Sequence, residues 1–235
     1  MFKSLVINKD DSQGYHTQVK ELNEADLQDG DVLIKVLYST INYKDALAIS
    51  GKAPVVRRFP MIPGIDLVGV VEQCDNSKFV VGQHVLLNGY GVGEKYLGGL
   101  SQKARINSEF LIPLPKSITP FNAMAIGTAG YTAMLSVMAL EKQGITPESG
   151  SILVTGATGG VGSFAIRILA ELGYSITAST GSTKQAAYLK QLGANEIIDR
   201  AELSAPGKPL MKERWAAAID SVGSTTLANV CASIN

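Results

Sequence analysis

The sequence predicts an α/β protein with two domains: a β-rich domain over residues 1–120 and a doubly wound parallel sheet over residues 121–235. Three observations support this fold class. Short Val-, Ile- and Leu-rich runs dominate the first part of the chain. From residue 151 onward, strand patterns alternate with amphipathic helical patterns, which is typical of parallel βαβ units. A glycine-rich turn joins the first of these strands to the first helix.

In the first domain, three segments have the β-rich composition of strands. They are residues 31–38 (DVLIKVLY), 65–72 (IDLVGVVE) and 82–87 (GQHVLL). Five glycines then fall between residues 89 and 99. Such a segment is either a tight main-chain path or a place where main chain approaches a ligand, and the spacing alone favours a surface hairpin.

A helical region follows the β-rich domain. Thr119 suits an N-cap and Pro120 suits the first helical turn, so the helix is expected to begin there. Gly127 and Gly130 interrupt an apolar run that continues to Leu140. Because glycine is costly inside a helix, these two residues indicate a close approach between helices or between main chain and a ligand.

The second domain is predicted to alternate four strands with three helices. The strands cover residues 151–155, 175–179, 196–198 and 215–220. Two helices cover 161–172 and 183–192, and residues 225–233 start a third. Gly173 and Gly193 are expected to terminate the first two helices as C-caps. The last helix would then hold Asn235 within it.

The turn at residues 156–162 (GATGGVG) is the most informative motif. It follows a predicted strand and opens a helix, which is the context that a dinucleotide site requires. Glycines let main-chain N–H groups approach a pyrophosphate, and the helix N-terminus adds positive potential. A P-loop is excluded because no Lys-Ser/Thr pair follows the last glycine. The alternative is a strand–helix turn that binds nothing.

The end of the second strand bears on the choice of cofactor. An acidic residue there would bond the ribose of NAD, but residues 179–184 (STGSTK) contain no carboxylate. Hydroxyls and one cation fit a 2′-phosphate, so NADP is favoured. Ser182 or Thr183 could also cap the next helix. Arg200, just past the third strand, is either a second cation for the phosphate or a solvated side chain.

Composition excludes several functions. The 21 basic and 21 acidic residues give no net charge, which argues against a nucleic-acid or membrane-surface partner. No apolar run is expected to approach a membrane span. Two histidines and two distant cysteines, Cys74 and Cys231, make a metal site improbable and a reduced, cytoplasmic protein the expected case.

Several blocks together resemble the medium-chain dehydrogenase/reductase superfamily, in its quinone-oxidoreductase type and most closely its acrylyl-CoA reductase branch. The resemblance runs through the whole chain in order. It is carried by residues 41–48 (INYKDALA), 59–66 (FPMIPGID), 89–94 (GYGVGE), 98–100 (GGL), 126–134 (IGTAGYTAM), 154–162 (VTGATGGVG) and 215–223 (WAAAIDSVG).

The resemblance implies an N-terminal GroES-like catalytic domain and a Rossmann domain that binds NADP(H). Zinc-dependent relatives carry a cysteine ligand where this chain has Asn42-Tyr43, so a zinc-free enzyme is expected. The implied reaction is NADPH-dependent reduction of an activated double bond, typified by acryloyl-CoA. The implied full-length form is a homodimer.

The resemblance also assigns site residues. Tyr43 is expected at the nicotinamide end, where it could also donate a proton, and Asn42 is expected to hold substrate or nicotinamide. Thr128 is expected on the nicotinamide side. The pyrophosphate is assigned to Thr158, Gly159, Gly160 and Val161, and the adenosine ribose and its phosphate to Thr180, Gly181 and Ser182, with Lys184 and Arg200 as further cations.

Two departures from the family pattern keep alternatives open. Close relatives tend to carry arginine where Ser182 stands, which weakens the NADP assignment unless Lys184 or Arg200 compensates. A complete Rossmann sheet of this type has six strands, so the four predicted here point to an incomplete domain and a truncated chain. A quinone or enone reductase, or a nucleotide-binding fragment without turnover, therefore remain alternatives to the enoyl-thioester reductase.

Overall fold

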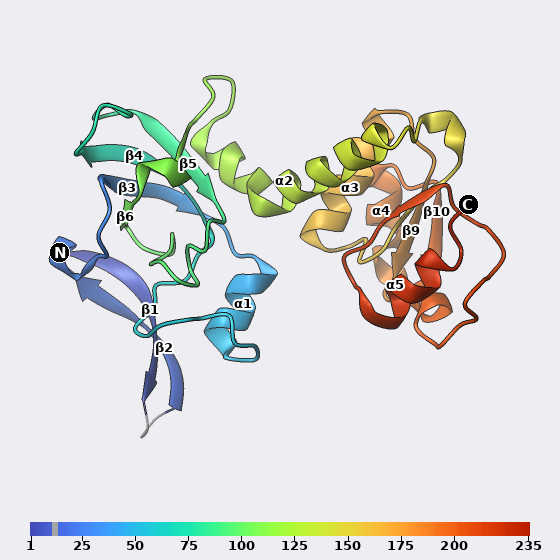
Figure 1. Ribbon diagram of the computed structural model, residues 1–235, viewed down its shortest axis with the longest axis horizontal. Helices are drawn as coiled ribbons and strands as arrows, with labels where there is room; N and C mark the ends of the chain where they lie inside the picture. The colour runs from blue at the N-terminus through green and yellow to red at the C-terminus, as the bar shows by residue number, and fades with distance from the viewer. Residues whose placement is uncertain (11–13) are drawn as a thin grey trace. The chain divides into compact units, whose positions relative to one another are not determined.

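The computed structural model describes residues 1–10 and 14–235. They form two compact units, Met1–Thr128 and Ala129–Asn235, and each is described here by itself (Figure 1). The division falls after Thr128, inside helix α2 (Pro120–Lys142), whereas the sequence predicts a domain boundary after residue 120.

The core of the first unit is a five-stranded antiparallel sheet with the order β6-β3-β4-β5-β7. Its buried residues include Val32, Ile34, Leu67, Val85 and Ile106, which pack into one apolar cluster. The strands are β3 (Val32–Ser39), β4 (Asp66–Cys74), β5 (His84–Asn88), β6 (Lys103–Ile106) and β7 (Ile112–Pro113). The three strands predicted in this unit are confirmed, whereas β6 and β7 are too short to show a clear pattern.

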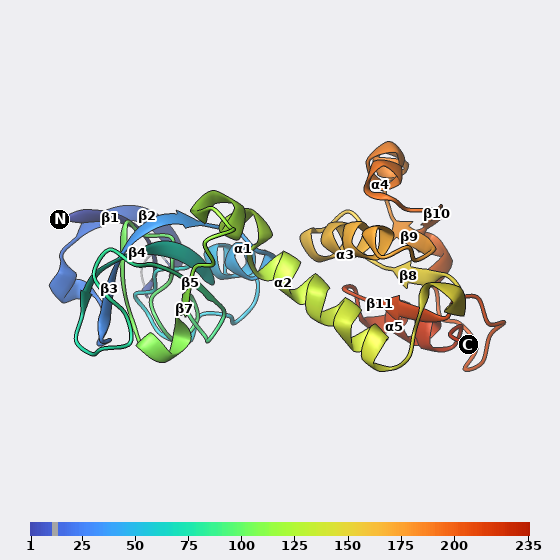
Figure 2. The same ribbon diagram turned by 90° about the horizontal axis from the view of Figure 1, so that it is seen from above.

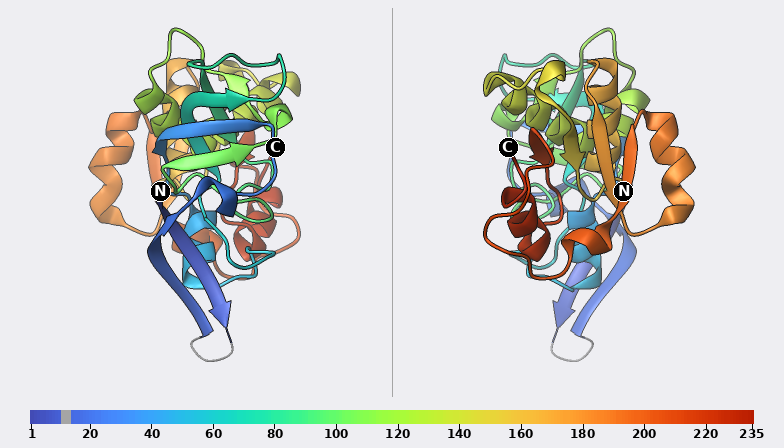
Figure 3. Two further views of the ribbon diagram at one scale, coloured as in Figure 1. Left: turned by 90° about the vertical axis from the view of Figure 1, so that its left-hand side faces the viewer. Right: turned by 90° about the vertical axis from the view of Figure 1, so that its right-hand side faces the viewer.

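Two further elements of this unit were not expected from the sequence. Strands β1 (Phe2–Asp10) and β2 (Gly14–Leu22) pair as an antiparallel hairpin, drawn in blue in Figures 1 and 3. Helix α1 (Tyr43–Ser50) is only eight residues long, and its C-cap, Gly51, has a φ of 65°. Short 3-10 turns complete the described chain: η1 (Glu24–Asp26), η2 (Ser108–Phe110), η3 (Pro147–Ser149), η4 (Thr183–Gln185) and η5 (Arg200–Leu203).

The glycine-dense segment is not a surface hairpin, and that expectation is wrong. Gly98 and Gly99 are buried, and the N–H of Gly99 donates to the carbonyl of Gly64 at 2.8 Å. A Cβ at Gly98 would lie 2.4 Å from the oxygen of Pro63, and one at Gly99 would lie 2.3 Å from the oxygen of Asp66. The glycines therefore let this segment lie directly on the main chain that leads into β4.

Helix α2 begins as predicted, since the Thr119 hydroxyl accepts a hydrogen bond from the N–H of Asn122 at 3.1 Å. Gly127, with φ 50° and ψ −160°, breaks the helix. By length and composition α2 could cross a membrane, so the expectation that no apolar run approaches a membrane span is wrong. A core helix of a soluble protein meets the same criterion. Here Met124 and Val137 each pack into an apolar core cluster of their own unit.

The second unit is a four-stranded sheet in which every pair of neighbouring strands is parallel, with the order β10-β9-β8-β11. Its strands are β8 (Ile152–Val154), β9 (Ile176–Thr180), β10 (Glu196–Asp199) and β11 (Ala217–Ile219), and its helices are α3 (Gly160–Glu171), α4 (Ala186–Leu192) and α5 (Ser224–Cys231). In chain order this is 3-2-1-4, the order of the first half of a doubly wound sheet. The predicted alternation of strands and helices is confirmed.

Helices cover both faces of this sheet (Figure 2). Ile152 and Val154 of β8 pack in one cluster with Leu169 of α3, while Leu153 of β8 packs in another with Val230 of α5. Figure 3 shows α4, drawn in orange, beside the β10 edge. Gly173 and Gly193 have φ values of 83° and 115°, which confirms both as helix terminators.

The expectation that the last helix holds Asn235 is wrong. Helix α5 ends at Cys231, and Ile234 forms a parallel bridge with Trp215. The N–H of Asn235 donates to the carbonyl of Trp215 at 3.0 Å. A single bridge to Trp215, just before β11, is therefore found where a further helical turn was expected.

Candidate functional site

A buried carboxylate organises the polar residues of the first unit. Asp66 opens β4 with 0% of its surface exposed. Its Oδ2 accepts hydrogen bonds from Thr40 Oγ1 and Asn42 Nδ2, both at 2.9 Å. Its Oδ1 accepts from Asn88 Nδ2 at 2.8 Å and from Thr128 Oγ1 at 2.5 Å, and the main-chain N–H of Thr128 donates to Oδ2 at 2.9 Å. We call these five residues the Asp66 cluster.

The break in α2 brings Thr128 to this cluster. A Cβ at Gly127 would lie 3.0 Å from Asp66 Oδ2 and 3.1 Å from Thr40 Cγ2. Its φ of 50° is also one that side chains disfavour, so both space and backbone geometry require glycine there. The interrupting glycine thus marks a close approach to a side chain, which sequence reasoning did not consider.

Asn42 is held at the N-terminus of α1 by a second buried carboxylate. Its main-chain N–H donates to Asp45 Oδ2 at 2.8 Å. Asp45 Oδ1 accepts from the N–H groups of Gly64 and Ile65 at 3.0 and 3.1 Å. Burial raises the pKa of Asp45, although these N–H donors oppose that shift. Tyr43 follows as the first residue of α1, with 81% of its surface exposed.

The structure thus brings two of the three predicted residues of this unit together. Asn42 and Thr128 both bond Asp66, whereas Tyr43 lies outside the Asp66 cluster, and its hydroxyl has no hydrogen-bond partner among residues 1–10 and 14–235. Sequence reasoning missed Asp66, Thr40 and Asn88. The one available signal was a carboxylate at the head of an otherwise apolar β-rich run.

The glycine-rich turn of the second unit is built from main chain. Gly156 has a φ of 56°, and a Cβ there would lie 2.3 Å from Ser221 Oγ. A Cβ at Gly162 would lie 2.5 Å from the Gly156 oxygen, so the turn and helix α3 pack without side chains between them. Gly159 is the N-cap of α3 and offers no side-chain acceptor to the first N–H groups.

The four residues predicted to hold the pyrophosphate lie at this turn. Thr158, Gly159 and Gly160 are exposed and Val161 is half-buried. Exposed N–H groups without a capping side chain at a helix N-terminus are suited to an anion. These residues therefore fit a pyrophosphate.

The end of β9 brings the predicted ribose-side residues together. Thr180 is buried, Gly181 is exposed, and the Ser182 N–H donates to Thr180 Oγ1 at 3.2 Å. Arg200 folds back over this end, because a Cβ at Gly181 would lie 2.5 Å from its Nε and 2.8 Å from its Cζ. Arg200 is exposed, so its side chain is solvated as well as placed beside the end of β9, and its role as a cation for the phosphate stays a prediction.

Two cations near this end have no acidic partner. Arg200 and Lys184 are both exposed, and neither forms an ion pair within the described chain. The neighbouring Asp199 carboxylate accepts from the N–H of Ala201 at 2.8 Å. The side chain of Thr183, a possible helix cap, lies outside the described residues.

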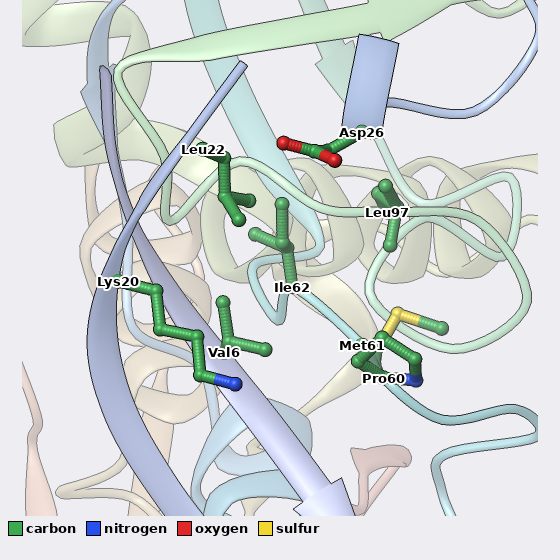
Figure 4. A pocket seen from close by; sticks show the side chains of 8 residues that line it. All are labelled: Val6, Lys20, Leu22, Asp26, Pro60, Met61, Ile62 and Leu97. Atoms are coloured by element: carbon green, nitrogen blue, oxygen red, sulfur yellow. The ribbon is translucent and has the colours of Figure 1, made fainter. Parts of the chain in front are cut away.

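No group of three or more His, Cys, Asp or Glu side chains that could hold a metal ion occurs among residues 1–10 and 14–235. A mostly apolar cavity of about 210 Å³ lies beside the β1–β2 hairpin, with Lys20 and Asp26 as its charged residues (Figure 4). None of the predicted site residues lines it, so it is not the candidate active site.

A glycine turn with an uncapped helix N-terminus, after the first strand of a 3-2-1-4 parallel sheet, defines a dinucleotide-binding domain. Comparison with known proteins gives the family. Residues 28–116 match the alcohol dehydrogenase GroES-like domain. The chain is 50% identical over 217 residues to the probable acrylyl-CoA reductase AcuI of Escherichia coli K12, covering 92% of this chain and 67% of that protein.

Two more relatives cover nearly the whole chain. The crystal structure of the YhdH oxidoreductase from Salmonella enterica in complex with NADP is 49% identical with a TM-score of 0.96, covering 99% of this chain and 71% of that one. The putative quinone oxidoreductase YhfP of Bacillus subtilis is 44% identical over 100% of this chain and 71% of its own length. Its structure, with NAD bound, has a TM-score of 0.93.

The chain therefore belongs to the medium-chain dehydrogenase/reductase superfamily, in the quinone-oxidoreductase type that includes the acrylyl-CoA reductases. This is a family of NADP(H)-dependent oxidoreductases. The GroES-like and Rossmann-like units expected from the sequence are confirmed.

Proposed function

We propose that this chain is an NADPH-dependent reductase of the activated double bond of an enoyl thioester such as acryloyl-CoA. The observation that carries the proposal is 50% identity with a probable acrylyl-CoA reductase over 92% of the chain. The blocks that carry the resemblance include Asn42, Asp66 and Thr128 of the Asp66 cluster and the whole glycine-rich turn. We further propose a cytoplasmic location, which the two free cysteines suit, and a homodimer.

The second unit supplies a binding site that fits the cofactor. The N–H groups of Thr158, Gly160 and Val161 would hold the pyrophosphate, because no side chain caps them. The Gly159 N–H donates to the Gly156 oxygen at 2.9 Å, so Gly159 would serve by leaving the approach open. Thr180, Gly181 and Ser182 would meet the adenosine ribose. When bound, NADPH supplies a hydride to the carbon β to the carbonyl.

Arg200 supports the choice of NADPH over NADH. Its guanidinium lies over Gly181, next in the chain to Ser182, which stands where the resemblance places an arginine in close relatives. A guanidinium can hold a phosphate with two parallel hydrogen bonds, so Arg200 would compensate for that replacement, with Lys184 as a second cation. The preference is a proposal for this chain, because the Bacillus subtilis relative was crystallised with NAD.

The first unit would then serve the substrate. After the β carbon gains a hydride, the electron pair of the double bond moves to the thioester oxygen, and the α carbon needs one proton. The Tyr43 hydroxyl is exposed and bonds no other group in the described chain, so it is free to donate that proton or to orient the nicotinamide. Asn42, fixed by Asp66, would border the same region.

The test is NADPH oxidation by the purified chain with three acceptors: acryloyl-CoA, a small quinone and a simple enone. We expect the highest kcat/KM with acryloyl-CoA. Tyr43→Phe should lower turnover by about a hundredfold if Tyr43 donates the proton, or weaken cofactor binding if it orients the nicotinamide. Tyr188→Phe, at another exposed tyrosine on α4, is the matched control and should change neither.

Identity of 44% with a putative quinone oxidoreductase favours a second candidate, quinone reduction. A higher kcat/KM with quinone than with acryloyl-CoA would select it. NADPH binding without oxidation by any acceptor would instead select a nucleotide-binding role without turnover.

A further inference from the structure

The hydrogen bonds of the Asp66 cluster all run in one direction. A carboxylate accepts hydrogen bonds and donates none, and Asp66 receives five of them. It has no surface exposed to water that could supply other donors. The carboxylate therefore fixes the orientation of every hydroxyl and amide that touches it.

Thr128 is the residue on which this direction matters most. Its hydroxyl has one proton, and that proton is donated to Asp66 Oδ1. The lone pairs of the hydroxyl remain, and no donor from the described chain approaches them. Thr128 is half-buried, so a ligand can reach it. To such a ligand Thr128 is an acceptor.

Thr40 offers a contrast within the same cluster. Its hydroxyl also donates to Asp66, at 2.9 Å, but it accepts a hydrogen bond from Asn42 Nδ2 at 2.8 Å. The Thr40 hydroxyl is thus engaged as both donor and acceptor inside the protein. Of the two threonines, only Thr128 keeps its acceptor for a ligand.

A ligand that forms a hydrogen bond with the Thr128 hydroxyl must therefore bring an N–H or O–H donor. The nicotinamide ring carries a primary amide, whose NH2 group is a double donor. We propose that Asp66 is a positioning residue that fixes the Thr128 hydroxyl as an acceptor for the amide NH2 of nicotinamide. This inference rests on the proposed function, because it takes NADPH as the ligand.

The experiment compares two dinucleotides on the full 235-residue chain by fluorescence titration. One is NADPH, and the other is its reduced 3-acetylpyridine analogue, in which a methyl ketone replaces the amide and removes both N–H donors. We expect the parent chain to bind NADPH about five- to tenfold more tightly than the analogue. Thr128→Val should bring this ratio near one, and Thr128→Ser, which keeps the hydroxyl, should restore it.

Asp66→Asn tests the positioning role. The new amide can turn its NH2 group toward Thr128 Oγ1 and occupy the lone pair, so the ratio should fall below about two. Ser39→Ala is the matched control, because Ser39 Oγ donates at 2.7 Å to the main-chain oxygen of Asp66 and not to its carboxylate. This control should keep the parent ratio, and all four variants should keep the parent preference for NADPH over NADH. Circular dichroism checks that each variant is folded.

Two results would overturn the inference while leaving the proposed function intact. One is equal binding of NADPH and the analogue by the parent chain. The other is a parent-like ratio in Thr128→Val, which tests the acceptor without altering the buried carboxylate. Failure of the folded parent to bind either dinucleotide would instead overturn the proposed function, and the inference with it.

Discussion

The two units of this chain build their polar sites from different materials. Around Asp66, one buried carboxylate accepts five hydrogen bonds from four residues, and most of these donors are side chains. Around Gly159, the groups on offer are main-chain N–H groups at a helix N-terminus, and no side chain caps them.

This difference determines which mutations each site tolerates. A site made of side chains depends on the chemical identity of each residue, because a changed donor leaves a buried partner unsatisfied. A site made of main chain depends on the absence of volume, because a Cβ would meet neighbouring backbone. The Asp66 cluster should therefore be sensitive to loss of polar groups, and the glycine turn to gain of atoms.

Gly162→Ala is expected to have the largest effect. The added Cβ would lie 2.5 Å from the Gly156 oxygen and 2.7 Å from Ala157 Cα, and backbone atoms cannot move aside cheaply. We expect the free energy of unfolding to fall by about 2–3 kcal/mol and NADPH binding to be lost. Urea unfolding and a fluorescence titration measure the two effects.

Gly159→Ala is the control for that prediction. A Cβ there meets only the Gly156 oxygen at 3.2 Å, and Gly159 does not have a positive φ. Its loss of stability should be clearly smaller. Equal losses in the two variants would show that volume is not what the turn restricts.

Asp45→Asn should have an intermediate effect in the side-chain-built site. The new amide has one oxygen and one NH2 group. If the oxygen accepts from Gly64 and Ile65, the NH2 group faces the N–H of Asn42, and if the oxygen accepts from Asn42, the NH2 group faces the other two N–H groups. We expect a loss of about 1–3 kcal/mol near pH 4, measured by urea unfolding. A loss near zero would mean that these three hydrogen bonds contribute little to holding α1.

The Asp45→Asn variant also isolates how Asp45 makes the free energy of unfolding depend on pH. Burial raises the folded-state pKa of Asp45, so the native state binds this proton more tightly than the unfolded state. The stability from Asp45 is then full below its unfolded pKa, about 4, and is lost as pH rises through the raised value. The stability gap between the parent and Asp45→Asn should therefore narrow as pH rises through that window.

For Asp31→Asn, the stability gap to the parent chain should change with pH in the opposite direction. Burial acts to raise the pKa of Asp31, but hydrogen bonds from Ser108 and Asn76 outweigh it and lower the pKa. Its stabilising contribution is thus present above the ordinary pKa and lost as pH falls through the lowered one. Slopes of the same sign for Asp31→Asn and Asp45→Asn in urea titrations would contradict this contrast.

Gly181→Ala should have the smallest effect on folding. Its Cβ would clash with Nε, Cδ and Cζ of Arg200, which form the far end of a flexible side chain that can move away. Stability should therefore change by less than about 0.5 kcal/mol. NADPH affinity should fall about two- to fivefold as the guanidinium is displaced, while NADH affinity stays the same. An isothermal titration that finds no change for NADPH would show that the position of Arg200 is unimportant.

The sequence predicted best what depends on neighbouring residues. The strands and helices of the second unit follow from local periodicity, and the glycine turn follows from its place between β8 and α3. The placement of Arg200 beside the end of β9 was one of the two alternatives predicted for it. It follows from the parallel pairing of β9 with β10, which brings the carboxyl ends of both strands to one edge of the sheet.

The sequence predicted least well what depends on distant residues. The Asp66 cluster joins Thr40 to Thr128 across 88 positions, and no local pattern marks its members. Strands β1 and β2 were missed because β2 shows no clear alternation of buried and exposed residues. Gly98 and Gly99 were misassigned to a surface hairpin because the residues that they contact, 62–66, lie more than thirty positions earlier in the chain.

The most direct single measurement is an isothermal titration of the parent chain, Arg200→Gln and Arg167→Gln with NADPH and with NADH. Arg167 is the matched control, because it lies on α3 and pairs with Glu171. We expect the parent to prefer NADPH by about tenfold or more, Arg200→Gln to lose that preference through weaker NADPH binding alone, and Arg167→Gln to match the parent. Equal binding of both cofactors by the parent, or an Arg200→Gln variant that keeps the full preference, would contradict the assignment of this chain as an NADPH-dependent reductase that reads the 2′-phosphate through Arg200.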